Sequence, residues 1–161
     1  EVLSQKGFEH YEISNFALEG QRSRHNEHYW RGGEYIGLGA GAHGCSKLGN
    51  ELIRYSNTQD IECYLDYKNN EQSPLNESIV GQTEYLSMID QAKERIMLGL
   101  RTSDGIVFEK ILKSIPLSMK DEWLKIARKL EKRNMVYLCE GKMIPTIAGM
   151  ANADGLAEEF F

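Results

Sequence analysis

The chain has 161 residues, of which 41% are hydrophobic and 27% charged, and its formal net charge is -5. This length suffices to bury a hydrophobic core in one domain or in two small ones. An acidic chain lacks the positive surface that nucleic acids attract, so we expect no nucleic-acid partner. The sequence contains neither an apolar run long enough for a transmembrane segment nor a signal peptide at its start, and we expect a cytoplasmic protein.

The first residues predict a chain that begins within an alternation of helices and strands. Residues 1–8, EVLSQKGF, are typical of the end of an amphipathic helix that Gly7 closes. Residues 10–17, HYEISNFA, have the length and composition of a strand. A helix followed directly by a strand is typical of α/β folds. Because the sequence also lacks an initial Met, we expect it to be the carboxy-terminal part of a longer protein.

The next segment, RHNEHYW (residues 24–30), carries two histidines, an amide and two aromatic rings in seven positions. Ser23 stands where an N-cap would start a short helical turn over these residues, and Arg31–Gly33 would end it. The glycine-rich run EYIGLGAGAHG (residues 34–44) follows and is predicted to open on a strand.

A hairpin and a helix are predicted to complete the first half of the chain. Residues 44–56 have a turn signal at Gly49–Asn50, between two strand-like runs. Thr58 or Asn57 would then cap an amphipathic helix over residues 60–70.

The second half of the sequence predicts three helices. Apolar residues recur at helical spacing over residues 82–100, which predicts the first helix. Asp104–Gly105, shortly after this range, would break the helix. A short helix is expected over residues 107–115. Pro116 precedes the third, over residues 118–134, whose apolar residues form one stripe.

A second hairpin and a last helix close the chain. Residues 135–146 predict a hairpin that turns at Glu140–Gly141, and residues 146–161 predict a helix that Thr146 caps. Three helices followed by a β-hairpin form the winged-helix pattern. Acidic residues lie among the lysines and arginines of the third helix, which favours a partner-docking or structural role over DNA binding. The polar, proline-containing residues 71–80 are expected to link the two halves.

The glycine-rich run allows two interpretations. Gly37, Gly39 and Gly41 alternate with larger apolar residues, so either a ligand or another part of the backbone could approach closely. Tight packing within a sheet is the simpler explanation. A dinucleotide site is excluded, because no long helix follows these glycines to bind a pyrophosphate.

The histidine segment also allows two interpretations. His25 and Tyr29 are four residues apart, as are Asn26 and Trp30, so a helix would carry them as two adjacent stripes. A zinc site needs more ligands than this segment offers, whereas a haem needs one axial nitrogen with aromatic rings beside it. In the alternative interpretation Tyr29 and Trp30 belong to the core, and the histidines are solvated.

The order of these motifs resembles one known family over nearly the whole chain. The sequence is similar to the oxygen-independent coproporphyrinogen III oxidase-like radical SAM proteins. The resemblance implies the last strands of a truncated (β/α) barrel in residues 1–70, the linker 71–80, and a small helical, winged-helix-like domain in residues 81–161. The matching segments are YEISNFA, RHNEHYW, GGEYIGLGAGAHG, RIMLGLRTSDGI and KMIPTIAGMANADGLAEEFF.

Within this family, the residues from His25 to Trp30 match the HNxxYW haem-binding motif of the haem chaperone branch. The resemblance therefore implies haem delivery, with haem or a porphyrin as ligand and a haem-acceptor protein as a further partner. It makes His25 the axial ligand of the iron, and Asn26, Tyr29 and Trp30 residues that shape the site. The alternative function is that of the oxidase itself, which decarboxylates the propionates of coproporphyrinogen III.

The resemblance extends, less specifically, to the region that approaches S-adenosylmethionine. Ala17 and the segment Gly41, Ala42 and His43 fall there. We place His43 at the end of a strand, where barrel strands carry functional residues. A histidine that bonds to backbone at a strand end is the alternative, and His10 is assigned to a strand edge without a role.

The full-length relatives also use a [4Fe–4S] cluster, which a CxxxCxxC loop holds. The three cysteines of this chain, Cys45, Cys63 and Cys139, are too scattered to hold one cluster. They also favour a reducing compartment without disulfides, in which we expect them to be small buried hydrophobic residues. We therefore expect this chain alone to hold no cluster and to be inactive as an enzyme, and its catalytic residues stay unknown.

Overall fold

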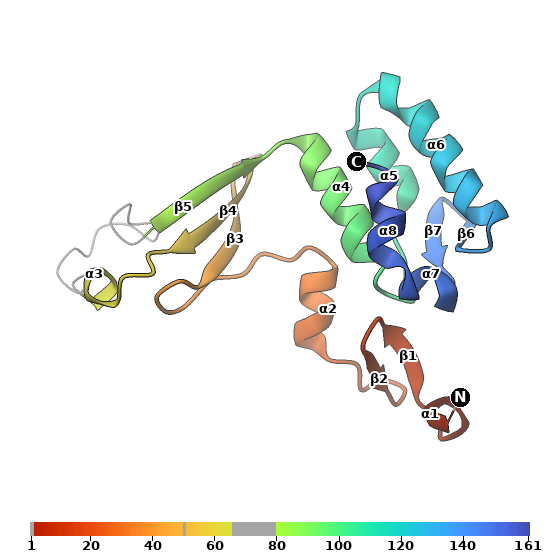
Figure 1. Cartoon of the computed structure of the whole chain (residues 1–161), viewed down its shortest axis with the longest axis horizontal. Helices are drawn as coiled ribbons and strands as arrows, with labels where there is room; N and C mark the ends of the chain where they lie inside the picture. Colours follow the sequence, from red (N-terminus) through yellow and green to blue (C-terminus); the bar gives the residue numbers. More distant parts are fainter. Residues whose placement is uncertain (1, 50, 66–79) are drawn as a thin grey trace. The chain divides into compact units, whose positions relative to one another are not determined.

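The computed structural model describes residues 2–49, 51–65 and 80–161, and contacts divide the chain into two units (Figure 1). The first unit joins the residues up to Gly32 with Met88–Phe161, and the second comprises Gly33–Ser87. Helices and strands are mixed, as predicted, whereas the described residues form no closed barrel. The expected linker, residues 71–80, lies almost entirely outside the described residues, so the predicted division at this point stays a prediction.

The first unit begins with a short helix and a hairpin. Helix α1 (Val2–Gln5) is followed by strands β1 (Glu9–Glu12) and β2 (Asn15–Ala17), which pair antiparallel. The prediction of one strand over residues 10–17 is therefore wrong. The chain turns after β1 because the Asn15 amide bonds the Glu12 carboxylate, and the Ile13 N–H donates to the carbonyl of Arg101 at 2.9 Å.

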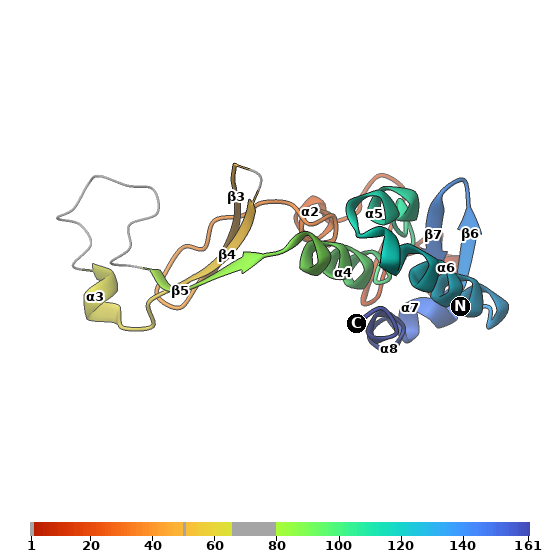
Figure 2. The ribbon, with the colours of Figure 1, turned by 90° about the horizontal axis from the view of Figure 1, so that it is seen from above.

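The core of the first unit lies among four helices (Figures 1 and 2). These are α4 (Met88–Gly99), α5 (Phe108–Ser114), α6 (Leu117–Lys132) and α8 (Ala153–Glu158). Their apolar stripes meet, so burial of apolar surface is the main source of stability here. The largest fully buried apolar side chains are Ile96, Leu100, Trp123, Leu130, Val136 and Met143.

The hairpin of β6 (Val136–Cys139) and β7 (Lys142–Pro145) packs against α5 and α6. Its turn lies at Glu140–Gly141, as predicted, and both residues have positive φ, 48° and 74°.

The expected closing helix over residues 146–161 is two helices, α7 (Ile147–Ala151) and α8. The break falls at Asn152, whose side-chain amide donates to the carbonyl of Ala148 at 2.9 Å. Asparagine competes in this way for backbone groups that would otherwise continue a helix.

The second unit contains a three-stranded antiparallel sheet in the order β3–β4–β5 (Figure 1). Strands β3 (His43–Leu48) and β4 (Glu51–Asn57) form the predicted hairpin, whose turn residue Asn50 lies outside the described residues. Strand β5 (Val80–Leu86) pairs with β4. The prediction of a helix from residue 82 is therefore wrong at its start, and the helix begins only at Met88.

Helix α3 (Ile61–Leu65) follows the sheet, and the residue that caps it differs from the prediction. The Asp60 carboxylate accepts the N–H groups of Glu62 and Cys63, at 2.9 and 3.1 Å. The expected cap Asn57 instead bonds the glycine-rich run. The other expected cap, Thr58, accepts the N–H of Asp60. Residues 66–70 of the predicted helix lie outside the described residues.

Thr146 caps α7 as predicted. Its hydroxyl accepts the N–H of Gly149 at 3.0 Å and donates to the carbonyl of Asn134 at 3.0 Å. We expect Thr146→Ala to lower the free energy of unfolding by about 1 kcal/mol, because both bonds are lost. Thr146→Ser keeps the hydroxyl and is the matched control. Chemical denaturation checks this, and an unchanged midpoint for Thr146→Ala would remove the cap from the account of stability.

Glu159 makes stability depend on pH. The hydrogen bond from Lys129, at 2.8 Å, and the pair with Arg133, at 2.5 Å, hold the pKa of Glu159 below its usual value. The pairs therefore stabilise the fold above the ordinary glutamate pKa, and this contribution is lost as the pH falls through the folded-state pKa. Near neutral pH we expect Glu159→Gln to cost up to about 1 kcal/mol, and the deficit to disappear in acid. Glu158→Gln, at the exposed neighbour, serves as the control in denaturation at several pH values.

Candidate haem-binding helix

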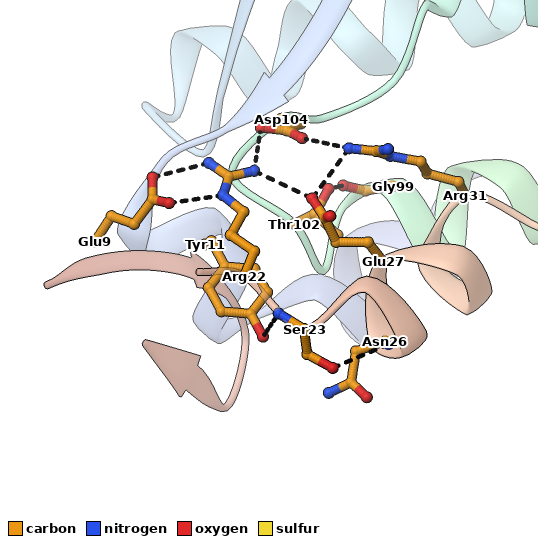
Figure 3. A network of polar contacts seen from close by, with 10 residues as sticks. All are labelled: Glu9, Tyr11, Arg22, Ser23, Asn26, Glu27, Arg31, Gly99, Thr102 and Asp104. Atoms are coloured by element: carbon orange, nitrogen blue, oxygen red, sulfur yellow. Dashed lines mark hydrogen bonds and ion pairs between the residues drawn. The ribbon is translucent and has the colours of Figure 1, made fainter. Parts of the chain in front are cut away.

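The histidine segment forms helix α2 (Arg24–Trp30), as predicted. Ser23 is its N-cap, and its hydroxyl accepts the N–H of Asn26 at 3.3 Å (Figure 3). After Trp30 the chain leaves the helix through Arg31 and Gly32, and Gly32 has a φ of 64°. The helix has only seven residues, of which Tyr29 and Trp30 are half-buried and none is fully buried, so apolar burial holds it only in part.

One side of α2 presents His25 and Tyr29 together. The imidazole of His25 is exposed, and its ring lies edge-on to the half-buried ring of Tyr29, with 4.8 Å between centroids and 81° between planes. His28 is also exposed, and its ring centroid lies 6.2 Å from that of Tyr29. The histidines are thus solvated, whereas Tyr29 is not a core residue. An exposed imidazole beside an aromatic ring fits a haem that binds from outside through one axial nitrogen.

Trp30 lies on the side of α2 that faces the residues after α4. Its ring is half-buried, and the guanidinium of Arg101 lies 5.7 Å from the ring centroid. Arg101 also pairs with Asp154 of α8. The Trp30 Nε1–H is buried and has no hydrogen-bond partner among the described residues. A buried N–H without a hydrogen-bond acceptor lowers the stability of the fold, and an acceptor on a ligand would remove this cost.

Charged residues at both ends and in the middle of α2 form ion pairs with one another and with a carboxylate from the turn after α4, on the side away from His25 and Tyr29 (Figure 3). The Arg22 guanidinium bonds Glu9 of β1 at 2.8 and 2.9 Å, and Asp104 at 2.8 Å. Glu27 of the helix pairs with Arg31, the residue directly after it, at 3.0 Å. We call these five residues the α2 ion cluster.

The cluster shifts the pKa values of Glu9 and Arg22. The hydrogen bond from Arg22 lowers the pKa of Glu9, although burial opposes it. Conversely, the bonds to Glu9 and then Asp104 raise the pKa of Arg22, which stays charged.

Residues 34–42 of the glycine-rich run form a loop rather than the predicted opening strand, and the last two residues of the run, His43 and Gly44, begin β3. Only Tyr35 forms an isolated bridge, to Cys45. The buried Asn57 holds the loop, because its side-chain amide donates to the carbonyls of Gly37 and Gly39 at 3.1 and 2.8 Å. A Cβ on Gly37 would lie 2.4 Å from the carbonyl oxygen of His43. The close approach at Gly37 is thus made by backbone, which favours the tight-packing interpretation there.

The residues expected near S-adenosylmethionine lie in both units. Ala17 is buried at the end of β2, in the first unit. Gly41, Ala42 and His43 belong to the second unit, where His43 begins β3 rather than ending a strand. The His43 imidazole is exposed, and no described residue bonds it, so the expected alternative of a backbone-bonded histidine is not observed. His10 lies in β1, stacked on Phe16 at 4.3 Å.

Cys45 is buried as predicted, whereas Cys63 and Cys139 are exposed, so the expectation of burial is wrong for these two. Cys63 lies in the short helix α3, which has no buried residue. Cys139 is the last residue of β6, a strand in which only Val136 is buried. Within residues 2–49, 51–65 and 80–161, no three His, Cys, Asp or Glu side chains gather as metal ligands. In the same ranges no helix is both long and apolar enough to cross a membrane.

Sequence reasoning did not identify the α2 ion cluster. Asp104 was recognisable only as part of a turn, Arg22 only as a polar residue before the predicted helical turn, and Glu9 only as a polar residue before the predicted strand over residues 10–17. Arg22 and Asp104 are 82 residues apart in sequence. No local pattern signals such a pair. Only the i, i+4 spacing of Glu27 and Arg31 could have been found in advance.

Comparison with known proteins relates the chain to one group. It is 32% identical over 160 residues, 99% of its length, to the protein named heme chaperone HemW of Lactococcus lactis, and 29% identical over 143 residues to that of Bacillus subtilis. It is 33% identical over 110 residues, 67% of the chain, to radical S-adenosyl methionine domain-containing protein 1 of Danio rerio. The chain covers 39%, 35% and 24% of these proteins, respectively.

A solved structure has a similar fold. It is the coproporphyrinogen III oxidase HemN of Escherichia coli, described as a radical SAM enzyme, with a TM-score of 0.66 and 15% identity over 99% of this chain and 38% of that one. No family model matches the sequence. The relatives named heme chaperone HemW are 29–36% identical to this chain, which spans 25–39% of their length, so the chain is similar to the HemW proteins.

Proposed function

We propose that this chain is the haem-binding part of a haem chaperone, in which His25 is the axial ligand of the iron and the haem is passed on to an acceptor protein. The observation that carries the proposal is the geometry of α2. It presents the exposed His25 imidazole edge-on to Tyr29, within a complete HNxxYW sequence. The relatives named heme chaperone support the same function.

The residues of α2 would have different roles in binding haem. His25 would supply the nitrogen that ligates iron, and Tyr29 would cover part of the macrocycle next to it. Asn26 and Trp30 form the adjacent stripe, where the buried Trp30 N–H still lacks a partner among the described residues. We propose that they orient the ligand rather than bind the iron.

We further propose that the whole protein is a cytoplasmic radical SAM protein that also uses S-adenosylmethionine and a [4Fe–4S] cluster. In it, residues 1–70 would belong to the last part of the barrel, and Ala17, Gly41, Ala42 and His43 would approach S-adenosylmethionine. The exposed His43 imidazole supports a role in binding. Residues 81–161 would form the winged-helix-like domain, a proposal that the hairpin β6–β7 and its contacts with α5 and α6 support.

Titration of the 161-residue chain with iron(III) haem, followed by its Soret band, tests this function. Iron-free protoporphyrin IX serves as the comparison ligand. We expect the chain to bind haem with a shifted Soret band, and to bind protoporphyrin at least about tenfold more weakly, because axial ligation needs the metal. Equal affinity for both ligands would contradict axial ligation. Decarboxylation of coproporphyrinogen III by the whole protein, supplied with S-adenosylmethionine and a reductant, would favour the oxidase alternative.

A further inference from the structure

We propose that Arg22 and Asp104 are positioning residues for His25, which hold α2 in the conformation that presents the imidazole to haem. The inference rests on the function proposed above. It adds residues outside the HNxxYW motif, one of which comes from the carboxy-terminal part of the chain.

Helix α2 needs polar contacts to stay folded. Seven residues are too few for a helix that is stable by itself in water. Tyr29 and Trp30 are half-buried and no side chain of the helix is fully buried, so its apolar anchor against the rest of the unit is only partial. Its cap Ser23 satisfies one N–H of the first turn, and the remaining candidates are the charged residues around it.

Arg22 fixes the start of the helix. It precedes the cap directly, and its guanidinium bonds both carboxylate oxygens of Glu9 and one of Asp104. The guanidinium also lies 5.5 Å from the ring centroid of the buried Tyr11. The hydroxyl of Tyr11 accepts the N–H of Ser23 at 3.3 Å. Two successive residues at the start of α2 are therefore tied to β1 (Figure 3).

Asp104 extends this hold to the end of the helix. One carboxylate oxygen bonds Arg22, and the other lies 3.6 Å from Arg31, which follows the last residue of α2. Glu27, in the middle of the helix, pairs with Arg31 at 3.0 Å and lies 3.6 Å from Arg22. One carboxylate from the turn after α4 thus contacts cations at both ends of the helix that carries His25.

The apparent affinity for haem depends on the fraction of molecules in which α2 is formed. A ligand that binds only the formed helix has an apparent affinity reduced in proportion to the fraction of molecules in which the helix is formed. If removal of the Arg22 guanidinium leaves α2 formed in about a tenth of the molecules, haem binds about tenfold more weakly. His25 still ligates the iron in those molecules, so the Soret maximum of the bound form stays where it is.

The test compares Arg22→Met with Arg133→Met in the 161-residue chain. Arg133 is the matched control, because it pairs with Glu159 on the same unit and lies outside the α2 ion cluster. We expect Arg22→Met to weaken haem binding by about tenfold with an unchanged bound spectrum, Arg22→Lys to recover part of the loss, and Arg133→Met to bind as the wild type does. Asp104→Asn should also weaken haem binding. The double variant with Arg22→Met should lose less affinity than the sum of the two single losses, because both changes affect the same Arg22–Asp104 contact.

Hydrogen exchange gives a second readout that does not depend on haem. The N–H groups of Glu27 and Arg31 bond the carbonyls of Ser23 and Glu27, both at 3.0 Å. We expect them to exchange faster in Arg22→Met than in the wild type or in Arg133→Met.

Three results would overturn the inference. If Arg22→Met binds haem as the wild type does while His25→Ala does not bind, the proposed function stands and the positioning role is wrong. An altered bound spectrum in Arg22→Met would make Arg22 part of the ligand site instead. A wild-type chain that binds no haem would contradict the proposed function, and the inference with it.

Discussion

His25→Ala is expected to abolish stable haem binding by the 161-residue chain, with loss of the shifted Soret band. Axial ligation depends on one imidazole nitrogen, and alanine offers no replacement. The change is also expected to leave the fold intact, because the side chain is exposed and its ring contact is with Tyr29 of the same helix. The measurement is a haem titration followed by absorbance, with thermal denaturation of the same samples to verify folding.

His28→Ala is the matched control for this prediction. His28 is an exposed histidine of the same helix, at a variable position of HNxxYW, and its ring also lies edge-on to Tyr29. We expect its loss to weaken binding less than His25→Ala does. If His25→Ala binds haem as tightly as the wild type, with the same spectrum, the assignment of the ligand is wrong. Comparable losses for both variants would mean that the helix, and not one imidazole, accounts for the binding.

Trp123→Ala is expected to lower the free energy of unfolding by about 3–5 kcal/mol. Trp123 is 2% exposed and lies in the middle of α6, where its ring packs edge-on against Phe160 with 5.6 Å between centroids. Its removal leaves a cavity among helices that a small change of the backbone cannot fill. A loss of this size is a large part of the 5–15 kcal/mol that stabilises a typical domain.

Chemical denaturation of three variants tests the core assignment. Trp123→Phe keeps an aromatic ring and should lose less than Trp123→Ala. Lys125→Ala changes an exposed residue of the same helix and should lie within about 0.5 kcal/mol of the wild type. A loss for Trp123→Ala no larger than that for Lys125→Ala would contradict the buried position of this ring.

Local signals in the sequence predicted local structure well. Ser23 and Thr146 cap the helices that follow them, and Glu140–Gly141 turns its hairpin. In each case the hydrogen bonds or backbone angles that define the feature involve residues within a few positions of one another. Such patterns hold wherever the neighbouring structure does not oppose them.

The start of α4 shows where local patterns fail. Tyr85 fits the helical spacing of Met88, Ile89 and Ala92, and the sequence therefore predicts helix. In the structure, β4 pairs with this segment, with Ile53 opposite Tyr85 and Leu52 opposite Leu86, and Tyr85 is 64% exposed. A strand partner about 30 residues earlier in the chain decides the conformation, and propensity is only a weak prior against it.

In the candidate site, too, local features could be predicted and contacts between distant residues could not. The motif helix and its cap could be predicted from contiguous residues, whereas Asp104 reaches Arg22 only through the folded first unit. Turn chemistry explains the Asp104–Gly105 pair fully by itself, so nothing in the sequence suggests a second role for this carboxylate.

The discontinuity of the first unit has a consequence for the order in which its parts become complete. Synthesis proceeds from the amino terminus, so the histidine helix is made long before Asp104 and before the helices that bury Trp123. Contacts between residues so far apart in sequence form late, because the intervening loop must close first. A nascent or truncated chain that ends before residue 104 therefore carries every letter of the motif, yet lacks the carboxylate that contacts both ends of its helix.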